Sequence, residues 1–169
     1  MERTGIVSFQ GNALTLTGDP VEVGRMAPDF MVLDNAFNPV KLSDFRGRIV
    51  IISAVPSLDT PVCELQTIRF NQEAAGLDAK LLTISMDLPF AQARFCDSHK
   101  IGGAQTLSDF RDREFAMKYG LYLKELGLIA RSVLIIDRDG LVAYLQIVPD
   151  ISSQPEYDDV LLAARKLGA

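Results

Sequence analysis

The chain has 169 residues, of which 48% are hydrophobic and 23% are charged, and its formal net charge at pH 7 is -5. A chain of this length buries roughly two thirds of the surface that its unfolded form exposes, so we expect one domain over residues 1–169. The acidic balance argues against nucleic acid and membrane surfaces as partners, and no apolar run approaches the roughly 18 to 20 residues of a membrane span.

The N-terminal part of the chain carries the signals of two extended pairs. Residues 6–18 hold two alternating runs around a Gly-Asn pair, which predicts a β-hairpin that adds to the main sheet. A second and weaker extended pair is expected at 29–33 and 40–42, around an intervening turn signal.

From residue 49 onwards strands alternate with helices. Apolar β runs are expected at 49–55, 81–86, 104–107, 132–137 and 141–148. Helices are expected at 60–75, in a short segment opened by Pro89, at 109–119 and at 156–167, and an apolar loop at 120–130. This order predicts an α/β fold with a mixed central sheet flanked by helices, for which a thioredoxin-like arrangement is the natural candidate. In such sheets the working site lies at the C-terminal ends of the parallel strands.

Cys63 follows the predicted strand at 49–55 and falls in the first turn of the next helix. If Asp59 or Thr60 caps that helix, Pro61 sits near its first position and Cys63 meets free backbone N–H groups and the positive end of the helix dipole. An unperturbed thiol has a pKa of about 8.5, so only a few per cent of it is ionised at pH 7. The dipole contributes only about 1 kcal/mol, so a thiolate there also needs a cation.

Spacing does not decide which arginine supplies this cation, because the chain offers Arg69, Arg94, Arg111, Arg113 and Arg131. Arg131 is favoured by position, since it stands immediately before the buried run 132–136 and its backbone is held at the edge of the core. A guanidinium fork can also hold a thiolate and a substrate oxygen at once, which a lysine does less well. The choice stays open at this level.

The second cysteine, Cys96, lies in the short helix between Pro89 and a Gly-Gly pair, a segment that can loosen locally at low cost. The first ten residues lack the pattern of a signal peptide, so we expect a cytoplasmic protein. In that reducing compartment a cysteine pair is more often catalytic, redox-sensing or simply buried than a structural staple. A cysteine at a helix start is also often an inert core residue, and that alternative stays open.

We interpret the remaining polar residues as surface residues without a role in catalysis. His99 is expected to be a solvated surface residue, because no acidic partner at catalytic spacing is evident. Asp109, Asp112 and Glu114 are expected to form a charged helix face. One histidine and two cysteines are too few for a zinc site, so we expect no metal.

The segment from Pro56 to Cys63 reads PSLDTPVC and resembles the PxxxTxxC active-site motif of the peroxiredoxins. The chain resembles more narrowly the atypical two-cysteine peroxiredoxins, the bacterial thiol peroxidase subfamily, through DLPFAQ at 87–92, RFC at 94–96, LSDFR at 107–111 and Ala-Arg at 130–131. The resemblance extends from the hairpin at 6–18 to the helix start at 155–157. It implies a single thioredoxin-like peroxiredoxin domain with an added N-terminal β-hairpin, in a homodimer.

The resemblance also implies roles for five residues. Cys63 would be the peroxidatic cysteine, whose thiolate attacks a hydroperoxide and becomes a sulfenic acid. Thr60 would hydrogen-bond the thiolate and the peroxide, and Pro56 would shield the pocket from water. Arg131 would polarise the peroxide and hold Cys63 ionised. Cys96 would be the resolving cysteine, which forms an intramolecular disulfide with Cys63 that thioredoxin reduces. This chemistry requires no metal or organic cofactor.

Two other functions stay open. The same cysteine pair would serve a peroxide sensor or redox relay, which passes its oxidation to a partner protein. A non-catalytic thioredoxin-like binding module with two buried cysteines is the second alternative. In either redox function, if both thiols lie in regular helices when reduced, they can meet only if part of one or both helices unwinds.

Overall fold

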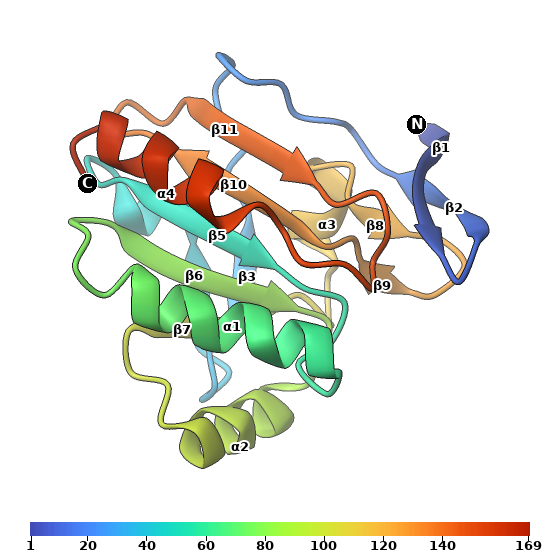
Figure 1. Cartoon of the computed structure of the whole chain (residues 1–169), viewed down its shortest axis with the longest axis horizontal. Helices are drawn as coiled ribbons and strands as arrows, with labels where there is room; N and C mark the ends of the chain where they lie inside the picture. The colour runs from blue at the N-terminus through green and yellow to red at the C-terminus, as the bar shows by residue number, and fades with distance from the viewer.

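The computed structural model describes residues 1–169 and contains two β-sheets and several α-helices (Figure 1). The main sheet has seven strands, in the order β11 (Val142–Ile147), β10 (Ser132–Ile136), β5 (Val50–Ala54), β6 (Lys80–Ser85), β7 (Ala104–Ser108), β3 (Met31–Leu33) and β4 (Pro39–Lys41). β5, β6 and β7 run parallel, and every other pair is antiparallel. The predicted α/β fold with a mixed sheet is therefore confirmed.

Helices cover both faces of this sheet. They are α1 (Pro61–Glu73), α2 (Pro89–His99), α3 (Glu114–Lys118) and α4 (Tyr157–Lys166), with a 3-10 turn at Leu42–Phe45. Figure 1 shows α1 and α4 in front of the sheet and α3 behind it. Along β5, Ile51 belongs to one apolar cluster with Phe70 of α1, and Ile52 belongs to another with Phe115 of α3. A strand buried on both faces in this way reads as a continuous apolar run. None of the helices has the length and apolar character needed to cross a bilayer.

The N-terminal hairpin is present, but it belongs to a second sheet rather than to the main one. This sheet has four strands, in the order β1 (Glu2–Phe9), β2 (Asn12–Thr17), β8 (Tyr122–Leu123) and β9 (Leu128–Ile129). The expectation of a plain loop at 120–130 was therefore wrong. Two-residue strands are too short to show a β period in the sequence, and their apolar side chains complete a small core with those of the hairpin.

The helix expected at 109–119 begins later, because α3 is limited to Glu114–Lys118. Arg113 has a φ of 54°, a left-handed conformation that a helix cannot contain. Asp109 lies before this break, and its carboxylate accepts hydrogen bonds from the backbone N–H groups of Phe115 and Ala116 at 3.1 and 2.8 Å. A side chain outside the helix thus satisfies its first donors.

The residues of the candidate site lie at one end of the strands of the main sheet. The parallel strands β5, β6 and β7 all end there, and the chain leaves β5 towards Cys63. β10 runs antiparallel to β5 and pairs Ser132 with Ala54, so β10 begins where β5 ends. This register places Arg131 beside the loop that leads to Cys63.

Candidate active site

Thr60 is the N-cap of α1, which decides between the two caps that the sequence left open. Its Oγ1 accepts a hydrogen bond from the backbone N–H of Cys63 at 3.3 Å, and Pro61 occupies the first helical position. The hydroxyl proton of Thr60 goes to the carbonyl oxygen of Ser57, at 3.3 Å, rather than to the sulfur. Thr60 therefore holds the backbone of Cys63 in the first turn, where the helix dipole favours an anion.

Arg131 is the arginine that contacts the sulfur. Its Nη2 donates a hydrogen bond to Sγ of Cys63 at 3.1 Å. Both side chains are buried, with exposed fractions of 1% for Arg131 and 0% for Cys63. The other four candidate arginines make no hydrogen bond to this sulfur.

The remaining partners of the Arg131 guanidinium are neutral oxygens. Nε and Nη2 donate to the carbonyl oxygen of Ile151 at 2.9 and 2.7 Å, and Nη1 donates to Oε1 of Gln66 at 2.7 Å. A buried cation without a countercharge costs several kcal/mol. No carboxylate pairs with Arg131, and the sulfur of Cys63 is the one remaining group that its guanidinium contacts.

Gln66 is a site residue that reasoning from the sequence missed. It is fully buried, its Oε1 accepts from Arg131, and its Nε2 donates to Oγ of Ser53 on β5 at 2.8 Å. Its spacing was the available signal, because a residue three positions after Cys63 lies on the same helix face. The chain Ser53, Gln66, Arg131 fixes the plane of the guanidinium against Cys63.

The N-terminal hairpin supports the other side of Arg131. The backbone N–H of Ser8 on β1 donates to the carbonyl of Pro149 at 2.7 Å, and the N–H of Ile151 donates to the carbonyl of Ser8 at 3.1 Å. These two bonds hold the segment after β11 so that the Ile151 carbonyl faces the guanidinium. The hairpin is thus part of the framework that positions Arg131.

Pro56 is buried in the loop that joins β5 to α1. Asp87, which follows β6, holds this loop: its carboxylate accepts from Oγ of Ser57, from the backbone N–H of Leu58 and from Oγ of Ser85, each at 2.7 Å. Bonds to a charged acceptor are among the stronger hydrogen bonds in proteins. One side chain therefore connects the loop before α1 to the segment that begins α2.

Cys96 is half-buried on α2 and, like Cys63, is a free thiol. Its Sγ lies 3.3 Å from Oγ1 of Thr106 on β7, and that hydroxyl donates its single proton to Oδ1 of Asn35 at 3.0 Å. The thiol of Cys96 is therefore the donor towards Thr106. The neighbouring Phe95 packs instead against the cluster that contains Cys63. Cys96 thus points to a different side of α2 from Phe95.

His99 has an acidic partner, so the expectation of an unpaired surface histidine was wrong. Its Nε2 lies 2.9 Å from Oε1 of Glu64, and its side chain is 28% exposed. Glu64 stands in the first turn of α1, next to Cys63, and His99 stands in the last turn of α2. The two partners are 35 positions apart in the chain, which hid this pair from reasoning on spacing.

Asp109 differs from the two acidic residues expected beside it. Asp112 pairs with Arg111 and Glu114 with Lys118 at the surface, but Asp109 is only 2% exposed. Burial raises the pKa of Asp109 to about 6, against the opposing effect of the backbone N–H groups of Ala116 and Phe115. No group of three or more His, Cys, Asp or Glu side chains is arranged to hold a metal ion.

Comparison with known proteins gives consistent matches. Residues 23–145 match the model of the AhpC/TSA family. The thiol peroxidase of Bacillus subtilis is 48% identical over 162 residues, which cover 95% of this chain and 97% of that protein. The thiol peroxidase of Staphylococcus haemolyticus is 45% identical over 161 residues, covering 95% and 98% respectively.

Two solved structures also resemble this chain. A peroxiredoxin-like protein from Aquifex aeolicus superimposes with a TM-score of 0.91 at 42% identity, covering 98% of this chain and 97% of that one. The thiol peroxidase from Chromobacterium violaceum, at 23% identity, shares the fold with a TM-score of 0.83 and covers 96% of this chain and 98% of its own.

Proposed function

Because this chain belongs to the AhpC/TSA family and is a peroxiredoxin-type thiol peroxidase, we propose that Cys63 is the residue that reduces hydroperoxides. The observation that carries this proposal is the 3.1 Å hydrogen bond from buried Arg131 to the sulfur of Cys63. A thiolate is the nucleophilic form of cysteine, and the guanidinium stabilises that form.

In the first step the Cys63 thiolate attacks the terminal oxygen of hydrogen peroxide or an alkyl hydroperoxide. An S–O bond forms and the O–O bond breaks, so Cys63 becomes a sulfenic acid. The other oxygen leaves with a proton as water or an alcohol. Arg131 offers fixed donors to the oxygen on which negative charge develops, which is the main electrostatic contribution available in this site. Thr60 contributes a hydroxyl beside the same helix start, and buried Pro56 limits access of water.

In the second step Cys96 acts as the resolving residue. Its thiol loses its proton, and the thiolate attacks the sulfenic sulfur of Cys63. The S–O bond breaks, the hydroxide takes up that proton and leaves as water, and an intramolecular disulfide forms that thioredoxin then reduces. The two cysteines lie on helices that pack through Phe95, and Cys96 must turn towards Cys63 for this step. The C-cap of α2, Lys100, has a φ of 53°, which marks a short helix that ends abruptly.

We also propose that the chain forms a homodimer and works in the cytoplasm. An exposed pair of aromatic side chains supports a protein contact: Phe37 and Phe90 are 40% and 67% exposed, with ring centroids 5.0 Å apart. Exposed aromatic side chains that cluster in this way are enriched at protein interfaces.

Intact mass after one equivalent of hydrogen peroxide, followed by non-reducing peptide mapping, tests the mechanism. We expect an intramolecular link between Cys63 and Cys96. Cys63→Ser should abolish peroxide reduction, and Cys96→Ser should permit one turnover and then stall. Sustained turnover of Cys96→Ser with thioredoxin would refute the resolving role.

The sensor or relay is the second candidate, and the free, separated thiols of this state are compatible with it. Continuous peroxide consumption with thioredoxin and its reductase distinguishes the two. Steady turnover favours the peroxidase, and a single oxidation without recycling favours the relay.

A further inference from the structure

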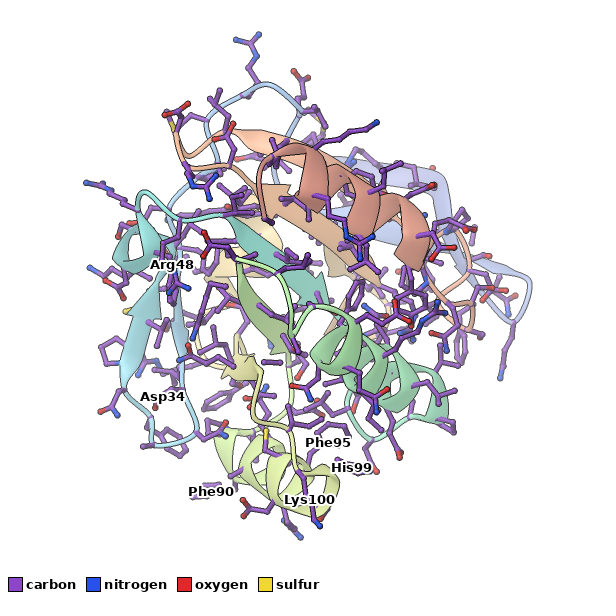
Figure 2. All side chains as sticks on the ribbon, turned by 60° about the vertical axis from the view of Figure 1, so that its left-hand side comes forward. Asp34, Arg48, Phe90, Phe95, His99 and Lys100 are labelled. Atoms are coloured by element: carbon purple, nitrogen blue, oxygen red, sulfur yellow. The ribbon has the colours of Figure 1, made fainter.

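One side-chain pair ties together the two helices that carry the cysteines. Nε2 of His99 on α2 lies 2.9 Å from Oε1 of Glu64 on α1, and Nδ1 of His99 lies 3.0 Å from the carbonyl oxygen of Phe95. Figure 2 shows Phe95 and His99 side by side at the part of α2 nearest to α1. We refer to the pair His99 and Glu64 as the clasp.

The number of hydrogen bonds that His99 makes depends on its protonation state. A carbonyl oxygen and an ionised carboxylate only accept hydrogen bonds, so both ring nitrogens of His99 must carry a proton to make both contacts. Only the imidazolium has two N–H groups, and a neutral histidine can donate to either Phe95 or Glu64. Loss of one proton from His99 therefore removes one of the two bonds.

The clasp also positions the ring that packs over the peroxidatic sulfur. The His99 ring stacks on Phe95, with centroids 4.3 Å apart and an interplanar angle of 28°. Phe95 in turn packs against the buried cluster of Val55, Leu58 and Cys63. A displacement of His99 therefore loosens both the contact between the helices and the cover of Cys63.

Five other charged residues lie near His99. They share the groove between α2 and the start of α1, or flank His99 on α2: Asp59, Asp87, Arg94, Asp97 and Lys100. The carboxylate of Asp87 is engaged by Ser57, Leu58 and Ser85. Glu64 is the one carboxylate within hydrogen-bond distance of the His99 ring.

We propose that the clasp sets the rate at which the Cys63 sulfenic acid reaches Cys96. With both bonds made, α1 and α2 stay in the arrangement that keeps Cys96 turned towards Thr106. Deprotonation of His99 weakens the clasp, so disulfide formation accelerates as the pH rises. A slower resolving step leaves the sulfenic acid exposed to a second hydroperoxide, which transfers an oxygen to give a sulfinic acid and water or an alcohol. The inference rests on the proposed resolving role of Cys96.

Two variants separate the hydrogen bonds of the clasp from its charge. His99→Phe keeps an aromatic ring against Phe95 but removes both bonds. Glu64→Gln keeps both bonds without the charge, because the amide can donate to the Nε2 of a neutral His99 while Nδ1–H donates to the Phe95 carbonyl. All forms retain Cys96, so ratios of their rates cancel the ionisation of its thiol.

The measurement is the rate of disulfide formation after a pulse of hydrogen peroxide, by rapid quench with alkylation and intact mass at about pH 6 and about pH 8. The pair is partly exposed, so we expect His99→Phe to form the disulfide about two- to fivefold faster than the wild type at the lower pH. This ratio should fall towards one at the higher pH, while the ratio of His99→Phe to Glu64→Gln stays constant. The wild type should also accumulate more sulfinic acid at the lower pH.

Each possible result tests either the role of the clasp or the resolving mechanism of the proposed function. Equal rates for all three proteins at both pH values would overturn the role of the clasp and leave the proposed function intact. Slower disulfide formation in His99→Phe, or a parallel loss of Cys63 oxidation rate and thermal stability, would also overturn it. If the wild type forms no disulfide between Cys63 and Cys96, the resolving mechanism itself fails.

Discussion

Arg131 and Cys63 are 68 residues apart in the chain, yet the guanidinium and the sulfur lie 3.1 Å apart in a buried site. The pairing of Ser132 with Ala54 brings the start of β10 to the end of β5, and the cap of Thr60 sets the start of α1. A strand register and a helix cap together bring the guanidinium of Arg131 to the sulfur of Cys63.

Arg131→Lys should lower the rate constant for peroxide reduction by about 100- to 1000-fold, the usual effect of removing a preorganised donor. A lysine ammonium is a point charge that cannot bond Cys63, Gln66 and Ile151 together. The measurement is kcat/KM with hydrogen peroxide, with the alkylation rate of Cys63 at pH 7 as a second readout. A Lys variant with unchanged values for both would contradict the role of the fork.

Gln66→Leu should leave Nη1 of Arg131 and Oγ of Ser53 without their partner. An unsatisfied buried polar group costs about 1 to 3 kcal/mol, so the free energy of unfolding should fall by that amount. Peroxide reduction should fall by roughly tenfold, because the guanidinium is no longer held in place.

Thr67→Val is the matched control for Gln66→Leu. Thr67 is also buried on α1 but donates to the carbonyl of Cys63 and does not contact Arg131. We expect a loss of stability in urea unfolding without a comparable loss of activity. Equal losses of activity in the two variants would show that activity follows the stability of α1 and not the contact between Gln66 and Arg131.

Thr60→Val should remove the cap of α1 and lower the free energy of unfolding by about 1 kcal/mol. The backbone N–H of Cys63 then loses the acceptor that holds it at 3.3 Å. Thr60→Ser keeps a hydroxyl at the same position and should retain most of the stability and activity. The comparison of urea midpoints and of peroxide reduction in the two variants checks this, and equal values would show that the hydroxyl is dispensable.

Asp109 should make stability depend on pH in a defined direction. The pKa of Asp109 in the folded protein is raised from 3.8 to about 6. The stability that the protonated carboxyl contributes is therefore fully present below about pH 3.8 and is lost as the pH rises through about 6. The free energy of unfolding of the wild type should therefore fall relative to Asp109→Asn by on the order of 2 kcal/mol across this range.

Urea unfolding at several pH values between about 4 and 7 measures this difference. Asp112→Asn is the control, because Asp112 is an exposed partner of Arg111. A constant difference between wild type and Asp109→Asn would mean that the buried carboxylate does not titrate in this range.

Local signals were sufficient for much of the fold. The apolar run at 49–55 is β5, the segment at 60–75 contains α1, and the alternation at 6–18 is the N-terminal hairpin. They failed at β8 and β9, which are very short, because pairing with a remote segment outweighs local propensity there. They also failed at the start of α3, where the carboxylate of Asp109, outside the helix, accepts from its first N–H groups.

Within the site, the motif identified Cys63 and Thr60, and position favoured Arg131. The spacing of Gln66 from Cys63 did not show that Gln66 contacts that arginine, and no pattern pointed to the Ile151 carbonyl or to the bond between His99 and Glu64. Each of these contacts joins elements that are adjacent only after the sheet and its helices have packed.

The sequence by itself determined that a thiol stands at the capped start of a helix after a buried strand, because caps, proline positions and apolar runs act over a few residues. Tertiary structure alone decided which cation meets that thiol, which way Cys96 points, and that His99 joins the two helices. These depend on strand register and on the packing of side chains from distant segments, where a shift of one residue would turn Arg131 away from Cys63.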